Sequence, residues 1–307
     1  MKVVSVNISE KKGTVKKPVG TIRLTESGVE GDAHAGDWNR QVSLLGVESV
    51  QRFEKLAKRK IAWGEFAENI TTEGIDLPVT KPLDRITAGE TELEITQIGK
   101  KCHGDSCAIF REVGNCVMPK EGIFARVIRT GTVKEGDELQ YHPKTFRVAV
   151  ITLSDRASRE IYADRSGPRI GELMAEHFDR TGRKYKIERQ VIPDDADKLE
   201  ELLRSFRDNG TDIIITTGGT GIGPRDITPE TVRKLIDKEL PGVMELIRYK
   251  YGSEKPGALL SRGVAGVMGR SLLFTLPGSL KAVNEYIEEI IKILMHAIYM
   301  IHGLDLH

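Results

Sequence analysis

Residues 214–230 read IITTGGTGIGPRDITPE: an apolar strand pattern runs into a cluster of glycines and a carboxylate, and a helix pattern follows. Three interpretations of this stretch are possible: a phosphate-binding loop, a cofactor-binding motif or a tight turn. The spacing fits neither the P-loop pattern G-x-x-x-x-G-K-[ST] nor the dinucleotide pattern G-x-G-x-x-G. Glycines do allow positive φ angles and a close approach of backbone N–H groups to a ligand, which favours a phosphate group.

Asp226 follows the glycines closely. A carboxylate beside phosphate oxygens is repelled unless a cation lies between them. Either Mg²⁺ or Arg225 would supply that charge, and we predict Asp226 as a Mg²⁺ ligand. Such a loop suits phosphoryl or nucleotidyl transfer, in which catalysis is mostly positioning and charge neutralisation. The alternative is a tight turn capped by Asp226.

The chain around this stretch alternates between strand and helix patterns. Near-continuous apolar strands separated by helices predict a three-layer α/β domain with a mostly parallel sheet. Thr228 is predicted as the N-cap of a helix with Pro229 at its first position. The predicted strands are 146–154, 185–192, 211–219 and 271–276, and the predicted helices are 167–182, 196–210, 228–240 and 279–301.

Polar clusters follow four of these strands. Ligands of open α/β sheets bind outside the carboxyl ends of the strands, so the four clusters are expected on one rim. Taken singly, each is typical of a helix cap or a turn. Together they predict a shared site, formed by Ser154-Asp155-Arg156, Pro193-Asp194-Asp195, the glycine run, and Pro277-Gly278-Ser279.

The first half of the chain has short apolar runs separated by Gly, Pro, Asp and Lys, which is typical of strands and turns. One helix is predicted at 46–60, with Val47, Val50, Phe53, Leu56 and Ala57 at helical spacing. Pro143 stops the strand before it. We therefore predict a mainly β domain at 1–142, a linker at 143–146 and the α/β domain at 147–307.

All three cysteines, Cys102, Cys107 and Cys116, lie in one stretch of the first half. Their odd number and the lack of a C-x₂-C pair argue against disulfides and against structural zinc. Cys102 follows two lysines and precedes His103, and nearby positive charge favours the reactive thiolate. Buried, inert cysteines are the alternative.

The charge balance is even, with 46 Lys and Arg against 45 Asp and Glu, so no nucleic acid or anionic membrane is expected as a partner. The start lacks the apolar core of a signal peptide, and the apolar run at 290–301 is short and carries Lys292 and His296. We expect a cytoplasmic protein. Lys11, Lys12, Lys16 and Lys17 are expected at a solvated hairpin tip.

Five segments of the second half together resemble the MoaB/Mog family, the molybdopterin adenylyltransferases of molybdenum cofactor synthesis. They are TLSDRASREIYADRSGPRI, VIPDDAD, DIIITTGGTGIGPRDITPE, LPGVMELIR and LSRGVAGVMGRSLLFTLPGS. The resemblance implies a molybdopterin-binding fold and a homotrimer. It also implies a reaction in which the terminal phosphate of molybdopterin attacks the α-phosphorus of ATP, with Mg²⁺, and releases pyrophosphate.

The resemblance assigns roles to several positions. Asp194 and Asp226 match two functionally important aspartates, and Ser279 matches a position near the pterin phosphate. Family members that insert molybdate tend to carry Ser where Thr220 stands, which favours adenylyl transfer. A non-catalytic carrier of molybdopterin is the alternative. The predicted cofactor-binding residues are Ser154, Asp155, Gly218, Gly219, Thr220, Gly221, Arg225, Pro277, Gly278 and Ser279.

Segments of the first half resemble a MOSC domain, a module named for the C-terminus of molybdenum cofactor sulfurase. They are GVEGDAHAGDWNRQVSLLG, FAENITTEGIDL, GKKCHGDSC and VMPKEGIFARVIRTGTVKEGDEL. The resemblance implies a β-barrel that handles the cofactor or carries sulfur on Cys102 as a persulfide. A cysteine desulfurase and a molybdate-inserting enzyme are then expected partners. The polar residues Asp32, His34, Asp37 and Arg40 suit either ligand contacts or a solvated loop.

Overall fold

The computed structural model describes residues 1–100 and 117–304. The chain forms two compact units, one of Met1–Lys144 with Leu304 and one of Thr145–Gly303. Only Pro143 and Lys144 separate β11 (Leu139–His142) from β12 (Thr145–Leu153), so β12 begins inside the segment where we placed a linker. No described helix has the length and apolar character needed to cross a membrane.

The first unit is mainly β, as predicted. Its larger sheet has the strand order β11-β7-β8-β9-β5-β6-β1-β2, and a smaller sheet has the order β10-β3-β4. β5 and β6 pair in parallel, and the register shifts within the β1–β6 and β8–β9 pairs. Closure of the large sheet into a barrel stays a prediction. The other strands are β1 (Lys2–Ile8), β2 (Lys17–Val19), β3 (Thr21–Thr25), β4 (Gly28–Val29), β5 (Val42–Gly46), β6 (Ile70–Glu73), β7 (Arg85–Ala88), β8 (Thr91–Ile98), β9 (Ile123–Arg129) and β10 (Gly131–Lys134), with the short helices η1 (Leu77–Val79) and α3 (Met118–Glu121) between them.

Helix α1 (Val47–Ala57) covers part of this unit. Its apolar side is buried at Val47, Val50 and Phe53, and the Phe53 ring meets the Phe66 ring edge to face at 5.0 Å between centroids. The helix is shorter than predicted because Lys58 takes a left-handed φ of 52° and ends it. Leu56, which we placed in the apolar stripe, is 66% exposed.

The second unit contains the predicted α/β sheet. Its strand order is β13-β12-β14-β17-β16-β15. The first four strands are parallel, whereas β16 pairs with β17 in antiparallel orientation and β15 pairs with β16 in antiparallel orientation at one edge. The sheet is therefore mixed and mostly parallel. Its strands are β12, β13 (Lys184–Ile192), β14 (Ile213–Thr217), β15 (Lys238–Glu239), β16 (Ala265–Met268) and β17 (Ser271–Leu276).

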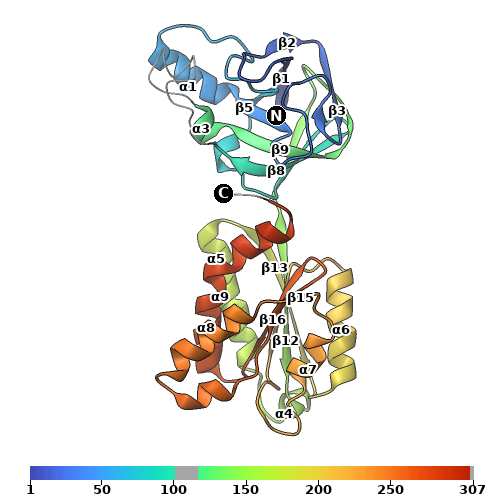
Figure 1. The fold of residues 1–307 in the computed structure, drawn as a ribbon, viewed down its shortest axis with the longest axis vertical. Helices are drawn as coiled ribbons and strands as arrows, with labels where there is room; N and C mark the ends of the chain where they lie inside the picture. Colours follow the sequence, from blue (N-terminus) through green and yellow to red (C-terminus); the bar gives the residue numbers. More distant parts are fainter. Residues whose placement is uncertain (101–116, 305–307) are drawn as a thin grey trace. The chain divides into compact units, whose positions relative to one another are not determined.

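Helices cover both faces of this sheet, which gives the predicted three layers. Figure 1 shows α5, α8 and α9 on one face and α6 and α7 on the other. On the α6 side, Ala149 and Ile151 of β12 pack with Leu199 and Leu203 in one apolar cluster. The helices are α4 (Asp155–Ser158), α5 (Ser166–Thr181), α6 (Ala196–Asp208), α7 (Thr228–Arg233), α8 (Pro241–Gly252), η3 (Pro256–Leu260) and α9 (Leu280–Ile301).

The region after the glycine run differs from our prediction. We expected one helix at 228–240, but α7 ends at Arg233 and β15 and α8 follow. Ile227 occupies the N-cap, so Thr228 is the first helical residue and Pro229 the second. Strand β16 was not predicted, because four residues that include Gly266 give too short a pattern.

The parallel strands bring their carboxyl ends to one edge of the sheet. The Ser154 N–H donates to the Ile192 carbonyl at 2.9 Å, and the Gly218 N–H donates to the Leu276 carbonyl at 2.9 Å. These bonds join the loop after β12 to the end of β13, and the loop after β14 to the end of β17. The four polar clusters predicted from the sequence therefore share this edge.

Candidate functional site

Two cavities flank the glycine run. The first, which we call the carboxylate cavity, has a volume of about 660 Å³. The second, the apolar cavity, has a volume of about 500 Å³. Gly219, Asp226 and Gly278 line both. Ser154, Asp155, Asp194 and Arg225 line the carboxylate cavity alone, and Thr220, Gly221, Pro277 and Ser279 line the apolar cavity alone.

The first two glycines are required by the backbone. Gly218 has a φ of +101°, and a Cβ there would strike the Leu153 carbonyl oxygen. Gly219 has a φ of +62°, and its Cβ would lie 2.5 Å from the Thr228 Oγ1. Side chains are thus excluded by conformation and by space. Among the described residues, Gly218 belongs to neither cavity wall, so its role is to let the loop pass close to β12.

The carbonyl groups of the loop are bonded to the surrounding domain. The Gly218 carbonyl accepts from the Thr228 hydroxyl at 3.0 Å, and the Gly219 carbonyl accepts from the Thr228 N–H at 3.1 Å. Within residues 1–100 and 117–304, the N–H groups of Gly219, Thr220 and Gly221 have no hydrogen-bond acceptor. Free backbone donors at a cavity wall are the groups that bind a phosphate.

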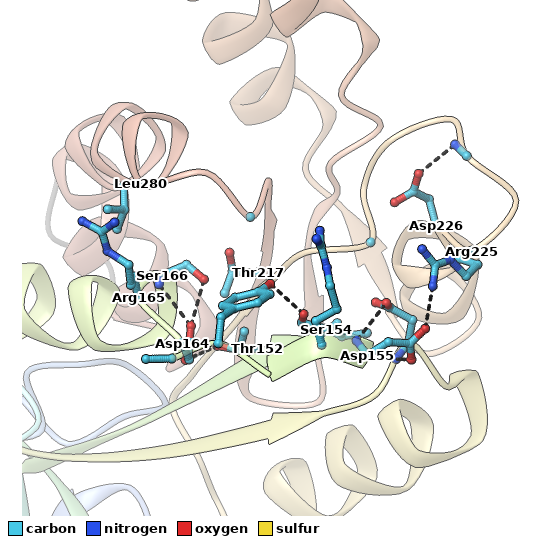
Figure 2. Close-up of a pocket in the computed structure, with 18 of the residues that line it drawn as sticks. Thr152, Ser154, Asp155, Asp164, Arg165, Ser166, Thr217, Arg225, Asp226 and Leu280 are labelled. Carbon is cyan, nitrogen blue, oxygen red and sulfur yellow. Dashed lines mark hydrogen bonds and ion pairs between the residues drawn. The ribbon is translucent and has the colours of Figure 1, made fainter. Parts of the chain in front are cut away.

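Asp155 and Asp194 form a reciprocal pair at one end of the carboxylate cavity. Each carboxylate accepts the backbone N–H of the other residue at 3.2 Å. The Arg225 guanidinium donates to Asp155 at 2.9 Å, as Figure 2 shows. Arg225 was one of the two cations considered for Asp226, the other being Mg²⁺, and the structure pairs Arg225 with Asp155.

The Asp226 carboxylate accepts the Gly223 N–H at 2.7 Å. It therefore caps a turn, as in the alternative interpretation, and it also lines both cavities. Burial raises the pKa of Asp194, and the negative charges of Asp155 and Asp226 act in the same direction. This end of the cavity thus carries excess negative charge, which a bound cation would neutralise.

The donor set is compatible with Mg²⁺ only if the substrate completes it. In the described part of the chain, no group of three or more His, Cys, Asp or Glu side chains is placed to hold a metal ion. Mg²⁺ commonly takes one or two carboxylates together with phosphate oxygens and water. Asp226 and Asp194, both on the wall of the carboxylate cavity, fit that arrangement.

The opposite end of the carboxylate cavity was missed by the sequence reasoning. Asp164 accepts from the Thr152 hydroxyl at 2.8 Å and from the N–H groups of Ser166 and Gly167 at 3.1 Å. In Figure 2, Asp164, Arg165 and Ser166 lie on one side of Thr152 and Thr217, and Asp155 and Arg225 lie on the other. Asp164 is engaged in these bonds and holds the start of α5. The sequence contains Asp164 in the segment REIYADRSG, which we quoted for the family resemblance without predicting a role for any of its residues.

The serines of the rim do cap helices. Ser154 accepts the Ala157 N–H at 3.2 Å, and Ser279 accepts the Ala282 N–H at 3.3 Å. The Ser154 hydroxyl also lies 2.8 Å from the Tyr162 hydroxyl. The interpretation as caps is therefore confirmed, and the same capped helix starts line the cavities, whereas the interpretation as a binding site stays a prediction.

The apolar cavity differs from its neighbour in its apolar surface, to which Ile222, Leu260 and Tyr286 contribute. Lys255 and Lys281 also line it, and Lys281 pairs with Glu285 of the same wall at 3.5 Å. Such a wall suits a ring system that carries an anionic group. The glycine run separates this cavity from the carboxylate cavity.

Comparison with known proteins identifies both units. The family described as a probable molybdopterin binding domain matches residues 149–296, and the MOSC domain family matches residues 31–140. A molybdopterin adenylyltransferase of Helicobacter pylori is 36% identical over 161 residues, which cover 52% of this chain and 90% of the relative. The chain belongs to the molybdopterin-binding-domain family. It carries a MOSC domain in addition.

Two further relatives each match about half of the chain. The molybdenum cofactor synthesis protein cinnamon of Drosophila melanogaster is 39% identical over 153 residues, which are 50% of this chain and 25% of that protein. The molybdopterin biosynthesis enzyme MoaB of Thermus thermophilus has 39% identity, covers 52% of this chain and 97% of its own, and superposes with a TM-score of 0.47. The chain thus spans a quarter of the cinnamon protein.

The MOSC unit contains a buried ionic cluster that contradicts one expectation. Lys16, which we placed at a solvated hairpin tip, is 2% exposed and pairs with the buried Asp32. Asp32 also accepts from the Ser9 N–H at 3.0 Å and from the Asn69 amide at 3.2 Å. Burial lowers the pKa of Lys16, which opposes the effect of Asp32.

His34 joins this cluster at its surface. Its Nδ1 lies 3.4 Å from both Lys16 Nζ and an oxygen of Asp32, and its side chain is 30% exposed. Asp32 is therefore a buried structural carboxylate, whereas His34 reaches solvent. The predicted nucleophile Cys102, together with Cys107 and Cys116, lies outside the described residues.

Gly218→Ala is expected to destabilise the molybdopterin-binding domain. The positive φ alone costs about 1–3 kcal/mol for a residue with a side chain, and the contact with the Leu153 carbonyl adds to this. Gly242→Ala is the control, because nothing lies within 4 Å of its Cβ and no positive φ is involved. Urea unfolding measures the difference, and equal midpoints for the two variants would contradict the close approach.

Asp194→Asn is expected to stabilise the protein at neutral pH. The pKa of Asp194 is raised in the fold, so ionisation costs stability as the pH rises above its ordinary value of 3.8. The melting temperature of the variant should exceed that of the wild type at pH 7, and the gap should narrow toward pH 4. Asp195→Asn is the control, since Asp195 caps α6 and asparagine caps equally well. A gap that is independent of pH would refute this account.

Proposed function

We propose that the molybdopterin-binding domain transfers the adenylyl group of ATP to molybdopterin. The observation that carries this proposal is the glycine run, whose unbonded N–H groups lie between two cavities of different chemistry. Two cavities that meet at Gly219, Asp226 and Gly278 provide places for two substrates whose phosphates must come together. The adenylyltransferase relative from Helicobacter pylori supports this reaction.

In the proposed reaction, a terminal phosphate oxygen of molybdopterin attacks the α-phosphorus of ATP. A new P–O bond forms, the bond between the α-phosphorus and the bridging oxygen breaks, and pyrophosphate leaves. The N–H groups of the glycine run hold phosphate oxygens in line, and such positioning accounts for most catalysis in phosphoryl transfer. The apolar cavity, with Tyr286 and Lys255, holds the ring system and its anionic group.

Mg²⁺ would be held by Asp226 and Asp194 and would neutralise the charge of the transferring phosphates. The paired carboxylates keep Asp194 in place, because its Oδ2 is fixed by the Asp155 N–H. Arg225 balances Asp155 and leaves Asp194 and Asp226 for the cation. A carrier that only binds molybdopterin needs neither carboxylate, so the two carboxylates favour the enzyme over the carrier.

Asp226→Asn tests the reaction. The purified protein with Mg²⁺, ATP and molybdopterin should form adenylylated molybdopterin and pyrophosphate. Chromatography measures both products. We expect the variant to lose about 10²–10³-fold in kcat with little change in molybdopterin affinity, because the cation acts on the transition state. Asp195→Asn, on the same rim, should retain activity.

Two results would contradict the proposal. A folded wild-type protein that binds molybdopterin but forms no product is a carrier. An Asp226→Asn variant that loses molybdopterin affinity as much as turnover would show that Asp226 contacts the pterin substrate and holds no cation.

For the MOSC domain we propose that Cys102 carries sulfur as a persulfide. The Cys102 thiolate would attack the outer sulfur of a cysteine persulfide on the desulfurase. A new S–S bond forms on Cys102, the S–S bond of the donor breaks, and the desulfurase cysteine leaves as a thiolate. The family match and the neighbouring lysines at 100 and 101 support this role. We further propose that the protein forms a homotrimer. A molybdate-inserting enzyme would then take the adenylylated product.

Incubation with a cysteine desulfurase and cysteine should add the mass of one sulfur atom to the intact protein. Cys102→Ser should abolish this addition, while Cys107→Ser should leave it unchanged. Mass spectrometry of thiol-labelled peptides locates the sulfur. Its persistence in Cys102→Ser would overturn the assignment.

A further inference from the structure

Arg262 holds the glycine run from the side of the antiparallel strand β16. Its backbone N–H donates to the Thr220 carbonyl at 3.0 Å, and its Nε donates to the Gly221 carbonyl at 2.7 Å. One terminal nitrogen donates to the Asp226 carbonyl at 2.9 Å, and the other pairs with the Glu230 carboxylate. Four contacts of one residue thus span the loop from Thr220 to the start of α7.

Arg262 is itself held in place. The Arg248 guanidinium donates to the Ser261 and Gly263 carbonyls at 3.4 and 3.2 Å, on either side of Arg262. The Val264 N–H donates to the Thr275 hydroxyl at 2.6 Å, and a Cβ at Gly263 would lie 2.8 Å from the Thr275 carbonyl. The segment that carries Arg262 is therefore packed directly on β17.

The contacts of Arg262 with the loop carbonyls also determine where the loop N–H groups point. In a trans peptide the C=O and N–H groups point in opposite directions. Binding the Thr220 and Gly221 carbonyls to Arg262 therefore turns the N–H groups of Gly221 and Ile222 away from Arg262. Within the described residues these two N–H groups have no acceptor, and both residues line the apolar cavity.

A glycine-rich loop does not keep this orientation by itself, because glycine tolerates many φ and ψ values. If the peptide after Thr220 or Gly221 rotated, a carbonyl oxygen would replace an N–H group. An anion would then meet a negative partial charge instead of a donor. The backbone N–H of Arg262 opposes rotation of the peptide after Thr220. The guanidinium opposes rotation of the peptide after Gly221, because its planar donors hold the Gly221 and Asp226 carbonyls at once.

We propose that Arg262 is a positioning residue that orients the N–H groups of the glycine run toward the phosphate groups of the substrates. In the described part of the chain Arg262 lines neither cavity, so it acts through the loop and not by contact with substrate. This inference rests on the proposed adenylyl transfer, and its ligand class is the phosphate group.

The test compares Arg262→Gln and Arg262→Lys with Glu230→Gln in the full-length protein. Arg262→Gln should lower kcat/KM for adenylyl transfer by about 10²-fold, because a small displacement of binding groups has effects of this size. Arg262→Lys should recover only part of the activity, since one ammonium cannot hold two separated carbonyls. Glu230→Gln removes the same ion pair and leaves the carbonyl contacts, so it should retain activity.

Chemical rescue separates positioning from folding. Arg262→Ala should regain activity when guanidinium is added at a non-denaturing concentration, while its melting temperature stays unchanged by that addition. Loss of activity with a parallel loss of folded protein, and no rescue, would overturn the proposal. Equal activity of Arg262→Gln and Glu230→Gln would overturn it too.

Calorimetric titration with pyrophosphate distinguishes the failure of this inference from failure of the proposed reaction. Pyrophosphate should bind the wild type and bind Arg262→Gln at least about tenfold more weakly. If the wild type forms no adenylylated product but shows this difference, the reaction is refuted and the role of Arg262 is upheld. If the wild type is active and both proteins bind pyrophosphate equally, the role of Arg262 is refuted.

Discussion

The candidate site depends on the close approach of Gly218 to the end of β12. A hydrogen bond from its N–H to Leu276 joins β14 to β17, and its φ of +101° turns the chain where a Cβ would strike the Leu153 carbonyl. This contact places the loop across the carboxyl ends of three neighbouring strands. Because parallel strands end at one edge, a single turn can divide the space there into two cavities.

The two cavities differ in their polar groups. Asp155 and Asp194 line the carboxylate cavity, where Arg225 pairs with Asp155, and Asp226 lines both cavities. Lys255 lies on the apolar side, as does Lys281, which pairs with Glu285. The loop between them has its carbonyls bonded to Thr228 and Arg262 and its donors free, so the fold itself determines which backbone groups meet an anion.

The MOSC domain uses buried charge in another way. Lys16 and Asp32 are almost fully buried, and such a pair repays its desolvation only when further hydrogen bonds satisfy it. Here Ser9 and Asn69 supply them and bring together the end of β1 and the start of β6. His34 is held against this pair with part of its ring exposed. The cluster fixes the loop that carries the sequence GDAHAG.

The sequence by itself determined the two-part organisation, the mostly parallel sheet and nearly all of the rim, because apolar periodicity and turn chemistry are local signals. It also indicated Asp194 and Asp226, since carboxylates after buried strands meet at one sheet edge. It could not show that Arg225 pairs with Asp155, that Lys16 is buried, or that Arg262 reaches the glycine run. Each of these contacts joins residues distant in sequence, and the direction in which each side chain points depends on packing. Only the tertiary structure could therefore decide which donors and acceptors were left for a ligand.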